Sequence, residues 1–239
     1  MLSDGKSMLI DSGESHYSKD VIKYIKRKGV KTLDVIVITH PHTDHMGGMA
    51  DILNSVGAKR IIMPRVDAQY TPTTYNYEEF LKTVQKKGLK IDTAKDESFT
   101  LGKADIKIIT ADYHGENLNN NSVQVKAVNG DNSFLITGDC EREEDELLIE
   151  KGADLKAKVL KVAHHGSATG SSADILDRIL PRYAVISVGE GNSYGQPHDV
   201  TMRRLEKYVD KIYRTDEDGT VVFISDGKGL SVMTTKIKK

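Results

Sequence analysis

Four side chains that can bind a metal ion stand within six residues of the chain, in the order His40, His42, Asp44 and His45. They follow the apolar run 34–38, which predicts a buried strand, and they precede Gly47 and Gly48, which permit a sharp turn into a helix. Imidazole and carboxylate groups suit borderline divalent metals. Two histidines two residues apart can point towards one ion, while the following acid and histidine turn towards another. We therefore predict metal ligands here rather than a chance cluster of surface histidines.

Other apolar runs end in residues that could complete such a site. Asp139 ends one of them and could bridge two ions, although a lone aspartate after a glycine is more often a turn residue or helix cap. His164 and His165 end another, and adjacent side chains point in different directions, so we expect one ligand from this pair. We favour His164, with His165 supporting it or facing the substrate, and the reverse assignment stays open. Asp11 ends the opening run and could orient a ligand histidine through a hydrogen bond.

The elements that must position these residues follow an α/β pattern, because strand-length apolar runs alternate with amphipathic stretches of helix length. Strands are expected at 7–10, 34–38, 60–63, 104–110, 123–128, 133–137, 157–162, 183–188, 211–214, 220–225 and 230–235. Helices are expected at 18–28, 47–56, 77–87, 141–150, 173–180 and 199–208, and an irregular loop at 65–76. The Asn129-Gly130 turn predicts a hairpin, and hairpins combined with crossover helices predict mixed sheets.

Length and composition narrow the possible classes of protein. The 239 residues, 38% hydrophobic and 29% charged, fit a single globular domain over 1–239, with room for a short strand ahead of Met1. No apolar run reaches the roughly 20 residues of a membrane-spanning helix. The net charge of -1 does not mark a dedicated nucleic-acid binder, and the single Cys140 leaves metal binding to histidines and carboxylates. No signal peptide is visible, which fits a cytoplasmic protein as written, or an exported one if a leader preceded this sequence.

These motifs resemble the metallo-β-lactamase superfamily, and more closely the metallo-hydrolase domain at the C-terminus of ComEC/Rec2 competence proteins and its free-standing relatives. The resemblance rests on Asp11-Ser12-Gly13, Thr39-His40-Pro41-His42-Thr43-Asp44-His45-Met46-Gly47-Gly48, Asn120-Asn121-Ser122, Thr137-Gly138-Asp139, His164-His165-Gly166-Ser167 and Asn192-Ser193-Tyr194-Gly195. It implies a four-layered αββα sandwich of two mixed β-sheets with metals at one edge. It also implies one or two Zn²⁺ ions, with Mn²⁺ as the alternative, and substrate contacts from Asn121, His165, Ser167 and Tyr194.

The sequence departs from this resemblance at the first metal position. Many superfamily members place a third histidine between the first cluster and the Thr-Gly-Asp motif, where this chain has Asn120-Asn121-Ser122. An asparagine amide is a weak neutral ligand, so we expect a loosely held first metal, one that binds with substrate, or a preference for manganese. His114 could substitute, but an ordinary loop histidine is the plainer interpretation. We predict that His198 reaches the leaving group or the scissile phosphate, against the alternative of a surface histidine at a helix start.

The predicted chemistry is hydrolysis by a hydroxide that bridges two cations, with Asp44 orienting the hydroxide and His198 protonating the leaving oxygen. The resemblance favours a phosphodiester substrate, with single-stranded DNA as the first candidate. Basic residues near the metal motifs could approach nucleic acid, although a solvated surface is the plainer interpretation: Lys156, Lys158, Lys161, Arg203, Arg204, Lys207 and Lys211. The alternatives are a hydrolase of smaller esters, such as a phosphocholine-type phosphodiester or a lactone, and a metal-poor module that binds a polymer without cleaving it.

Overall fold

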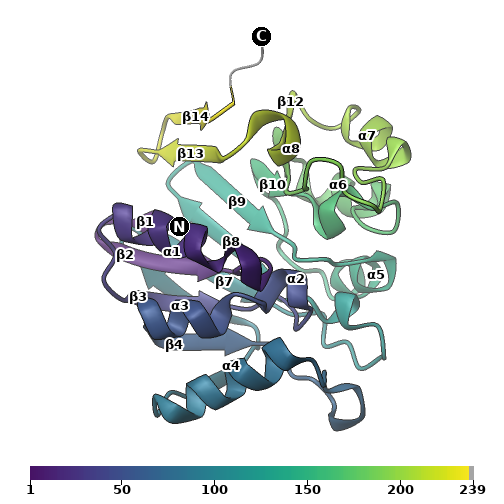
Figure 1. Cartoon of the computed structure of the whole chain (residues 1–239). Helices are drawn as coiled ribbons and strands as arrows, with labels where there is room; N and C mark the ends of the chain where they lie inside the picture. The colour runs from purple at the N-terminus through teal and green to yellow at the C-terminus, as the bar shows by residue number, and fades with distance from the viewer. Residues whose placement is uncertain (237–239) are drawn as a thin grey trace.

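The computed structural model describes residues 1–236 as two β-sheets with helices packed on their outer faces (Figure 1). The first sheet has the order β1-β2-β3-β4-β5, formed by Leu2–Ser3, Lys6–Ile10, Leu33–Val37, Ala58–Met63 and Ile91–Thr93. In this sheet β1 is antiparallel to β2, and the other neighbours are parallel. The expected mixed character of the first sheet is confirmed.

The second sheet has the order β12-β11-β10-β9-β8-β7-β6. Its antiparallel part consists of β6 (Glu97–Leu101), β7 (Ala104–Ile109), β8 (Gln124–Asn129) and β9 (Asn132–Ile136). Its parallel part adds β10 (Val159–Lys161), β11 (Tyr183–Ile186) and β12 (Lys211–Arg214) to β9. A separate hairpin follows, with strands β13 (Val221–Ser225) and β14 (Leu230–Thr234).

Helices form the two outer layers. The helices α1 (Ser18–Arg27), α2 (Thr43–Met46), α3 (Met49–Ser55) and α4 (Tyr75–Lys86) accompany the first sheet, and α5 (Arg142–Glu150), α6 (Ala173–Ile179), α7 (Asp199–Leu205) and α8 (Thr215–Asp218) accompany the second. Short 3₁₀ turns lie at η1 (Ser15–Tyr17), η2 (Ala68–Tyr70), η3 (Leu118–Asn121) and η4 (Ala163–Gly166). Over residues 1–236, none of the helices is long and apolar enough to cross a lipid bilayer.

Alternation along β3 explains how one strand joins two layers. Val35 and Val37 belong to the core between the sheets, where they meet residues such as Ile106 of β7 and Val125 of β8. Ile36, on the opposite face of β3, belongs to the core beneath the helices of the first layer. Successive strand side chains point to opposite faces, so a continuous apolar run is required where both faces are buried.

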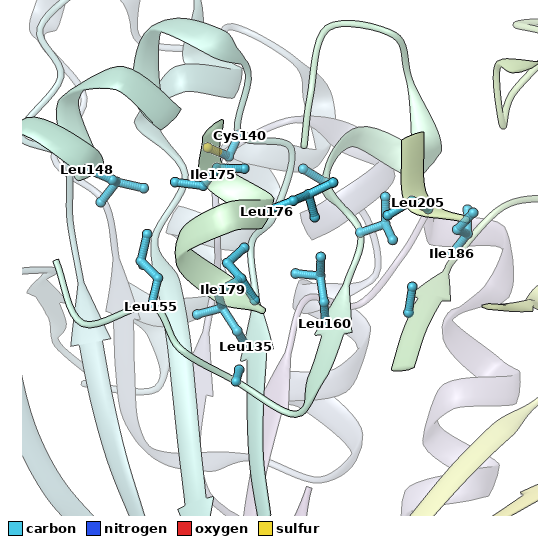
Figure 2. Close-up of a cluster of buried hydrophobic side chains, with 14 of the residues drawn as sticks. Leu135, Cys140, Leu148, Leu155, Leu160, Ile175, Leu176, Ile179, Ile186 and Leu205 are labelled. Atoms are coloured by element: carbon cyan, nitrogen blue, oxygen red, sulfur yellow. The ribbon is translucent and has the colours of Figure 1, made fainter. Parts of the chain in front are cut away.

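The second helical layer is held by a larger aliphatic cluster. Figure 2 shows Leu176 and Ile179 of α6 above Leu135 of β9 and Leu160 of β10, with Leu148 of α5 at one side. Burying aliphatic side chains of this kind contributes about 1.5–3 kcal/mol each relative to exposure. This packing fixes the ends of β9 and β10, from which two segments of the candidate site emerge.

The αββα architecture expected from the sequence is confirmed, while several short elements were missed. Strands β1, β5 and β6 and helix α8 were not predicted. The helix expected at 47–56 is the shorter α3, and helix α2, which lies before the pair Gly47-Gly48, was not predicted. A Cβ on Gly47 would lie 2.5 Å from the Thr43 carbonyl oxygen and 2.9 Å from the Ser15 backbone nitrogen, so η1 can approach α2 only if this residue is glycine.

Candidate metal centre

Asp44, His45, Asp139 and His165 bring four potential ligand atoms together, all within 4.8 Å of one another. Asp44 and His45 lie in α2, directly after β3, whereas Asp139 and His165 follow β9 and β10. His45 and Asp139 are buried, while Asp44 is exposed enough to reach solvent. The four-residue cluster therefore draws two ligands from each half of the αββα sandwich.

Hydrogen bonds orient His45 so that one ring nitrogen faces the cluster. Its Nδ1 lies 2.7 Å from the Asp11 carboxylate. An ionised carboxylate only accepts, so Nδ1 carries a hydrogen, and Nε2 is the nitrogen that can bind a cation once it loses its proton. Asp11 is itself fixed, because the Thr39 backbone N–H donates to its Oδ1 at 2.8 Å and the Thr39 hydroxyl donates to its Oδ2 at 2.7 Å. Asp11 thus aims the Nε2 of His45, which lies 3.1 Å from Asp139 Oδ1.

His165 is oriented in the same manner from the other sheet. Its Nδ1 donates to the Ser187 carbonyl oxygen at 2.7 Å, directly after β11. Its Nε2 is left 3.3 Å from Asp44 Oδ2, 3.4 Å from Asp139 Oδ2 and 3.3 Å from the Nε2 of His45. Two imidazole lone pairs and two carboxylates consequently converge on one point. Such a set of nitrogen and oxygen donors fits a divalent cation.

Asp139 provides an independent sign that the cluster fits a cation. Its Oδ1 is buried and makes no hydrogen bond, although His45 Nε2 lies 3.1 Å away. At this distance the two atoms can share a proton or bind one cation. A buried oxygen without a partner costs about 1–3 kcal/mol, which an ion at this position would recover.

The charge state of the cluster matches this arrangement. Burial alone would lower the pKa of His45, but Asp11 and Asp139 outweigh burial and raise it to about 10. Burial alone would raise the pKa of Asp44, but the hydrogen bond from His165 and the charge of His45 outweigh it and bring the pKa to about 2. The carboxylates are therefore ionised at neutral pH, and a proton on His45 occupies the position that a cation would take.

His40 and His42 form a second pair of nitrogens beside this cluster. The Nδ1 of His40 lies 3.2 Å from the Thr39 hydroxyl, which donates to Asp11 and so accepts from the ring. The Nε2 of His40 is left facing the Nδ1 of His42 at 3.1 Å. Two ring nitrogens at this distance can share a proton or bind one cation. The pair offers only two of the ligands that an ion needs.

The side-chain oxygen of Asn119 could serve as a third ligand beside His40 and His42. Asn119 was not predicted as a site residue. Its Nδ2 donates to Glu141 Oε1 at 3.0 Å, which fixes the orientation of the amide. Its Oδ1 is buried and without a hydrogen bond, and Asn119 lines the same cleft as His42, Asp44 and Asp139. The available signal was the run of three asparagines at 119–121, whose first member lay outside the motif we used.

The three residues Asn120, Asn121 and Ser122 bond to the protein rather than lining the cleft. Asn120 Oδ1 accepts from the Glu141 backbone N–H at 3.1 Å, and so caps the start of α5. Ser122 Oγ accepts from the Asp139 backbone N–H at 3.0 Å. Asn121, expected to contact substrate, instead donates to the Arg65 carbonyl oxygen outside the cleft.

The two adjacent histidines take different positions from those we favoured. His165 belongs to the four-residue cluster, whereas the Nε2 of His164 lies 4.0 Å from Asp139 Oδ2 and its Nδ1 lies 3.0 Å from Glu141 Oε1. His164 lines the cleft wall. Both residues have left-handed backbone conformations, with φ of 47° and 54°. Strand alternation therefore did not apply to them, and two such residues in succession are typical of a functional site.

The structure does not bring His198 or Ser167 into the four-residue cluster. His198 Nδ1 accepts from the Ala168 backbone N–H at 2.9 Å, and its Nε2 donates to the Tyr194 carbonyl oxygen at 3.2 Å. Ser167 Oγ pairs with the Thr169 hydroxyl at 3.0 Å. Both residues thus organise loops beside the site. Tyr194, in contrast, is 77% exposed and lines the cleft.

Asp44, Asp139 and His165 of the four-residue cluster line an open cleft of about 740 Å³. One wall comes from the segment after β2, including Glu14 and Tyr17, and the opposite wall from the loop that carries Tyr194 and Gln196. A cleft open to solvent admits a chain-like substrate as well as a small one. This geometry, a polar floor with ionised carboxylates between two accessible walls, suits hydrolysis of an ester whose ends extend beyond the protein.

Comparison with known proteins agrees with this geometry. The sequence profile of the metallo-β-lactamase superfamily matches residues 1–190. The chain belongs to this superfamily. The fold of this superfamily is that of metal-dependent hydrolases, so the chain is assigned to that class of enzyme, and the four-residue cluster is its candidate metal site.

Two relatives match most of the length of this chain. It is 27% identical over 207 residues to "ComE operon protein 3" of Bacillus subtilis, covering 86% of this chain and 26% of that protein. It is 28% identical over 226 residues to "Recombination protein 2" of Haemophilus influenzae, covering 92% of this chain and 26% of that protein. The chain thus spans about a quarter of the length of these relatives.

A solved structure shows the same fold at low sequence identity. CmlA, a diiron β-hydroxylase from Streptomyces venezuelae, superposes with a TM-score of 0.52 at 14% identity, covering 77% of this chain and 44% of that chain. The similarity concerns the fold alone. The two chains therefore share a fold although few of their residues are identical.

Proposed function

We propose that this chain is a metal-dependent phosphodiesterase that cleaves DNA, with single-stranded DNA as its substrate. The observation that carries the proposal is the convergence of His45 Nε2, His165 Nε2 and the carboxylates of Asp44 and Asp139 on one point at the floor of an open cleft. Asp11 and the Ser187 carbonyl oxygen hold the two histidines in that orientation. The relatives named for recombination and for a competence operon support DNA as the substrate.

The same residues would hold a Zn²⁺ or Mn²⁺ ion, and His40, His42 and the Asn119 oxygen would hold a second, weaker one beside it. When bound, such an ion lowers the pKa of water and stabilises negative charge on phosphoryl oxygens. A second position with one neutral amide in place of a third imidazole suits Mn²⁺, which prefers oxygen ligands more than Zn²⁺ does.

The residues of the chain divide the remaining work between them. Asp44 is ionised and reaches the cleft, so it orients a water molecule towards the scissile phosphorus. The Asp139 backbone N–H donates to Ser122 Oγ, which fixes a carboxylate that would be shared by the two metal positions. His198 is a positioning residue in this proposal, because both of its ring nitrogens are bound to the backbone of the surrounding loops.

The test is turnover of bis-p-nitrophenyl phosphate and of a single-stranded oligonucleotide with Zn²⁺ or Mn²⁺, in the natural protein and in Asp44→Ala. We expect the substitution to lower both activities at least about a hundredfold and to lower bound metal. Asp210→Ala is the matched control, because it removes an exposed carboxylate that pairs only with Arg182 among the described residues. Turnover of glycerophosphocholine or of a lactone, without turnover of either phosphodiester probe, would replace DNA with a small ester as the substrate.

A further inference from the structure

We propose that α1 is a binding track for the backbone of a single-stranded DNA whose scissile phosphate lies in the metal cleft. This inference rests on the proposed function and adds a second, non-catalytic surface to it. The track consists of Lys19, Lys23, Lys26 and Arg27, which line a shallow groove of about 560 Å³ together with Ile22 and Ser55. The groove lies along α1, on the side where that helix meets α3.

The four cations of the track are uncommitted. Within residues 1–236, the side chains of Lys19, Lys23, Lys26 and Arg27 have no acidic or hydrogen-bonding partner, and all four residues are exposed. Lys19, Lys23 and Lys26 recur at the spacing of one helical face. Asp20 is the single acid within α1, and it does not line the groove. Exposed cations held in a row without counter-charges favour a polyanion as the occupant.

Three of the basic residues near the other metal motifs are engaged by the protein itself, whereas Lys156, Arg203 and Lys207 are exposed. Lys158 Nζ donates to Asn132 Oδ1 at 2.8 Å, and Lys161 Nζ donates to the Val162 carbonyl oxygen at 3.2 Å. Arg204 donates to the Ser171 carbonyl oxygen at 2.8 Å. These residues hold strand ends and loops together. The cations of α1 differ from the remaining exposed ones in that four of them line one groove together.

The track begins close to the metal cleft along the chain. Tyr17, at the end of η1, lines the cleft, and Lys19 in the first turn of α1 lines the groove. The helix connects the parallel strands β2 and β3, so it begins at the sheet edge that carries the metal ligands and runs back towards the opposite edge. Figure 1 shows this purple helix extending from the side of α2 along the first sheet. A strand leaving the cleft past Tyr17 would meet the cations in sequence order.

Tyr17, the aromatic residue at the start of the track, could contact the bases of a single strand of DNA. Tyr17 is 56% exposed, and the ring of His16 lies against it with centroids 3.8 Å apart. Bases stack on exposed aromatic rings with little regard to sequence. From Lys19 to Lys26 the helix advances about 10 Å, a distance that spans about three phosphates of a stacked strand.

The experiment compares the natural protein with the triple variant Lys19→Gln/Lys23→Gln/Lys26→Gln. Binding is measured for an oligothymidylate of about 16 nucleotides with phosphorothioate linkages, which slow its cleavage, across a range of salt concentrations. We expect the variant to lose at least about tenfold in affinity at low salt, and its log–log salt slope to shrink by about 2, since each phosphate contact on a single strand contributes about 0.7. Turnover of bis-p-nitrophenyl phosphate should be unchanged, because that probe is too short to reach the track.

The matched control is Lys86→Gln/Lys87→Gln/Lys90→Gln. These exposed lysines lie between the end of α4 and β5, and so at the sheet edge opposite the metal cleft. The same charge is removed there, and affinity for the oligonucleotide should change by less than about threefold.

Three results would overturn the track. These are an unchanged salt slope in the Lys19 triple variant, an equal loss in the Lys86 control, and loss of binding to vesicles containing phosphatidylserine without loss of binding to the oligonucleotide. The last result would make α1 a membrane-contacting surface. Failure of the proposed function would look different, because neither the natural protein nor any variant would then turn over bis-p-nitrophenyl phosphate.

Discussion

His45 shows how one residue becomes a ligand through what lies behind it. The imidazole could present either nitrogen to the cleft, and Asp11 decides between them by accepting a hydrogen bond from Nδ1. The same Asp11 carboxylate accepts from the hydroxyl of Thr39, which in turn orients His40. A single half-buried acid therefore sets the tautomers of histidines in both candidate metal positions.

At Asn119 we predict that a histidine would strengthen the second metal position. Asn119→His replaces a neutral amide oxygen with an imidazole, a better ligand for zinc. We expect the metal content of purified protein to rise towards two Zn²⁺ ions per chain, measured by elemental analysis after dialysis. Asn121→His is the control, because Asn121 bonds to Arg65 outside the cleft and should leave the stoichiometry unchanged. Equal metal content in the Asn119 variant and the natural protein would remove Asn119 from the site.

Residue types and their spacing indicated most of the candidate site, but side-chain direction was beyond their reach. The cluster from His40 to His45 and the acid Asp139 were recognisable because they follow apolar runs. The choice between His164 and His165 depended on two left-handed backbone conformations, which no strand pattern encodes. His198 was expected at the leaving group, yet its hydrogen bonds to backbone atoms of Ala168 and Tyr194 could be known only from the folded loops.

At the scale of elements, long buried strands could be predicted from the sequence, whereas short edge strands could not. Long apolar strands such as β3 and β4 were predicted within three residues at each end, because burial on both faces demands a continuous apolar run. β5, with the sequence Ile-Asp-Thr, has no such run and is defined only by its pairing with β4. Short edge strands of this kind depend on tertiary contacts, so sequence periodicity alone does not reveal them.

The turn between β9 and α5 is sensitive to substitution. Gly138 has a φ of 54°, and a Cβ there would lie 2.7 Å from Ser122 Oγ and 2.9 Å from Thr39 Cβ. Gly138→Ala should therefore cost about 1–2 kcal/mol for the backbone conformation and about 1–3 kcal/mol more for the clash. Since Asp139 follows directly, we also expect metal affinity to fall about tenfold or more. Chemical denaturation and metal titration measure the two effects.

Gly152→Ala is the control for this prediction. Gly152 has a φ of 68° but no atom within 4 Å of an added Cβ, so it carries the conformational cost without the clash. A Gly138 variant no less stable than the Gly152 variant, with normal metal affinity, would show that the turn tolerates displacement.

At the scale of the whole molecule, the candidate metal site joins the two sheets. Asp44 and His45 follow β3 of the first sheet, while Asp139 and His165 follow β9 and β10 of the second. The core between the sheets holds them together by apolar contact, and a bound ion would add a polar link at one edge. An ion that binds only the folded chain stabilises it by about 2.7 kcal/mol at a hundred times its Kd.

We predict that this stabilisation grows with pH. In the metal-free protein, the raised pKa of His45 stabilises the fold fully below about pH 6.5, and this contribution is lost as pH rises towards about 10. A metal ion competes with the same proton, so the gain in melting temperature on adding Zn²⁺ should be larger at about pH 8.5 than at about pH 6.5. Calorimetric melting with and without EDTA measures this. In Asp139→Asn the metal-dependent gain should disappear, and a gain equal to that of the natural protein would place the ion elsewhere.

The order of the ligands along the chain has a consequence for synthesis. A growing chain that has emerged only as far as α5 carries Asp44, His45 and Asp139, but not His165, nor the three parallel strands that complete the second sheet. The complete four-residue cluster therefore forms only after His165 has been made and both sheets have packed together.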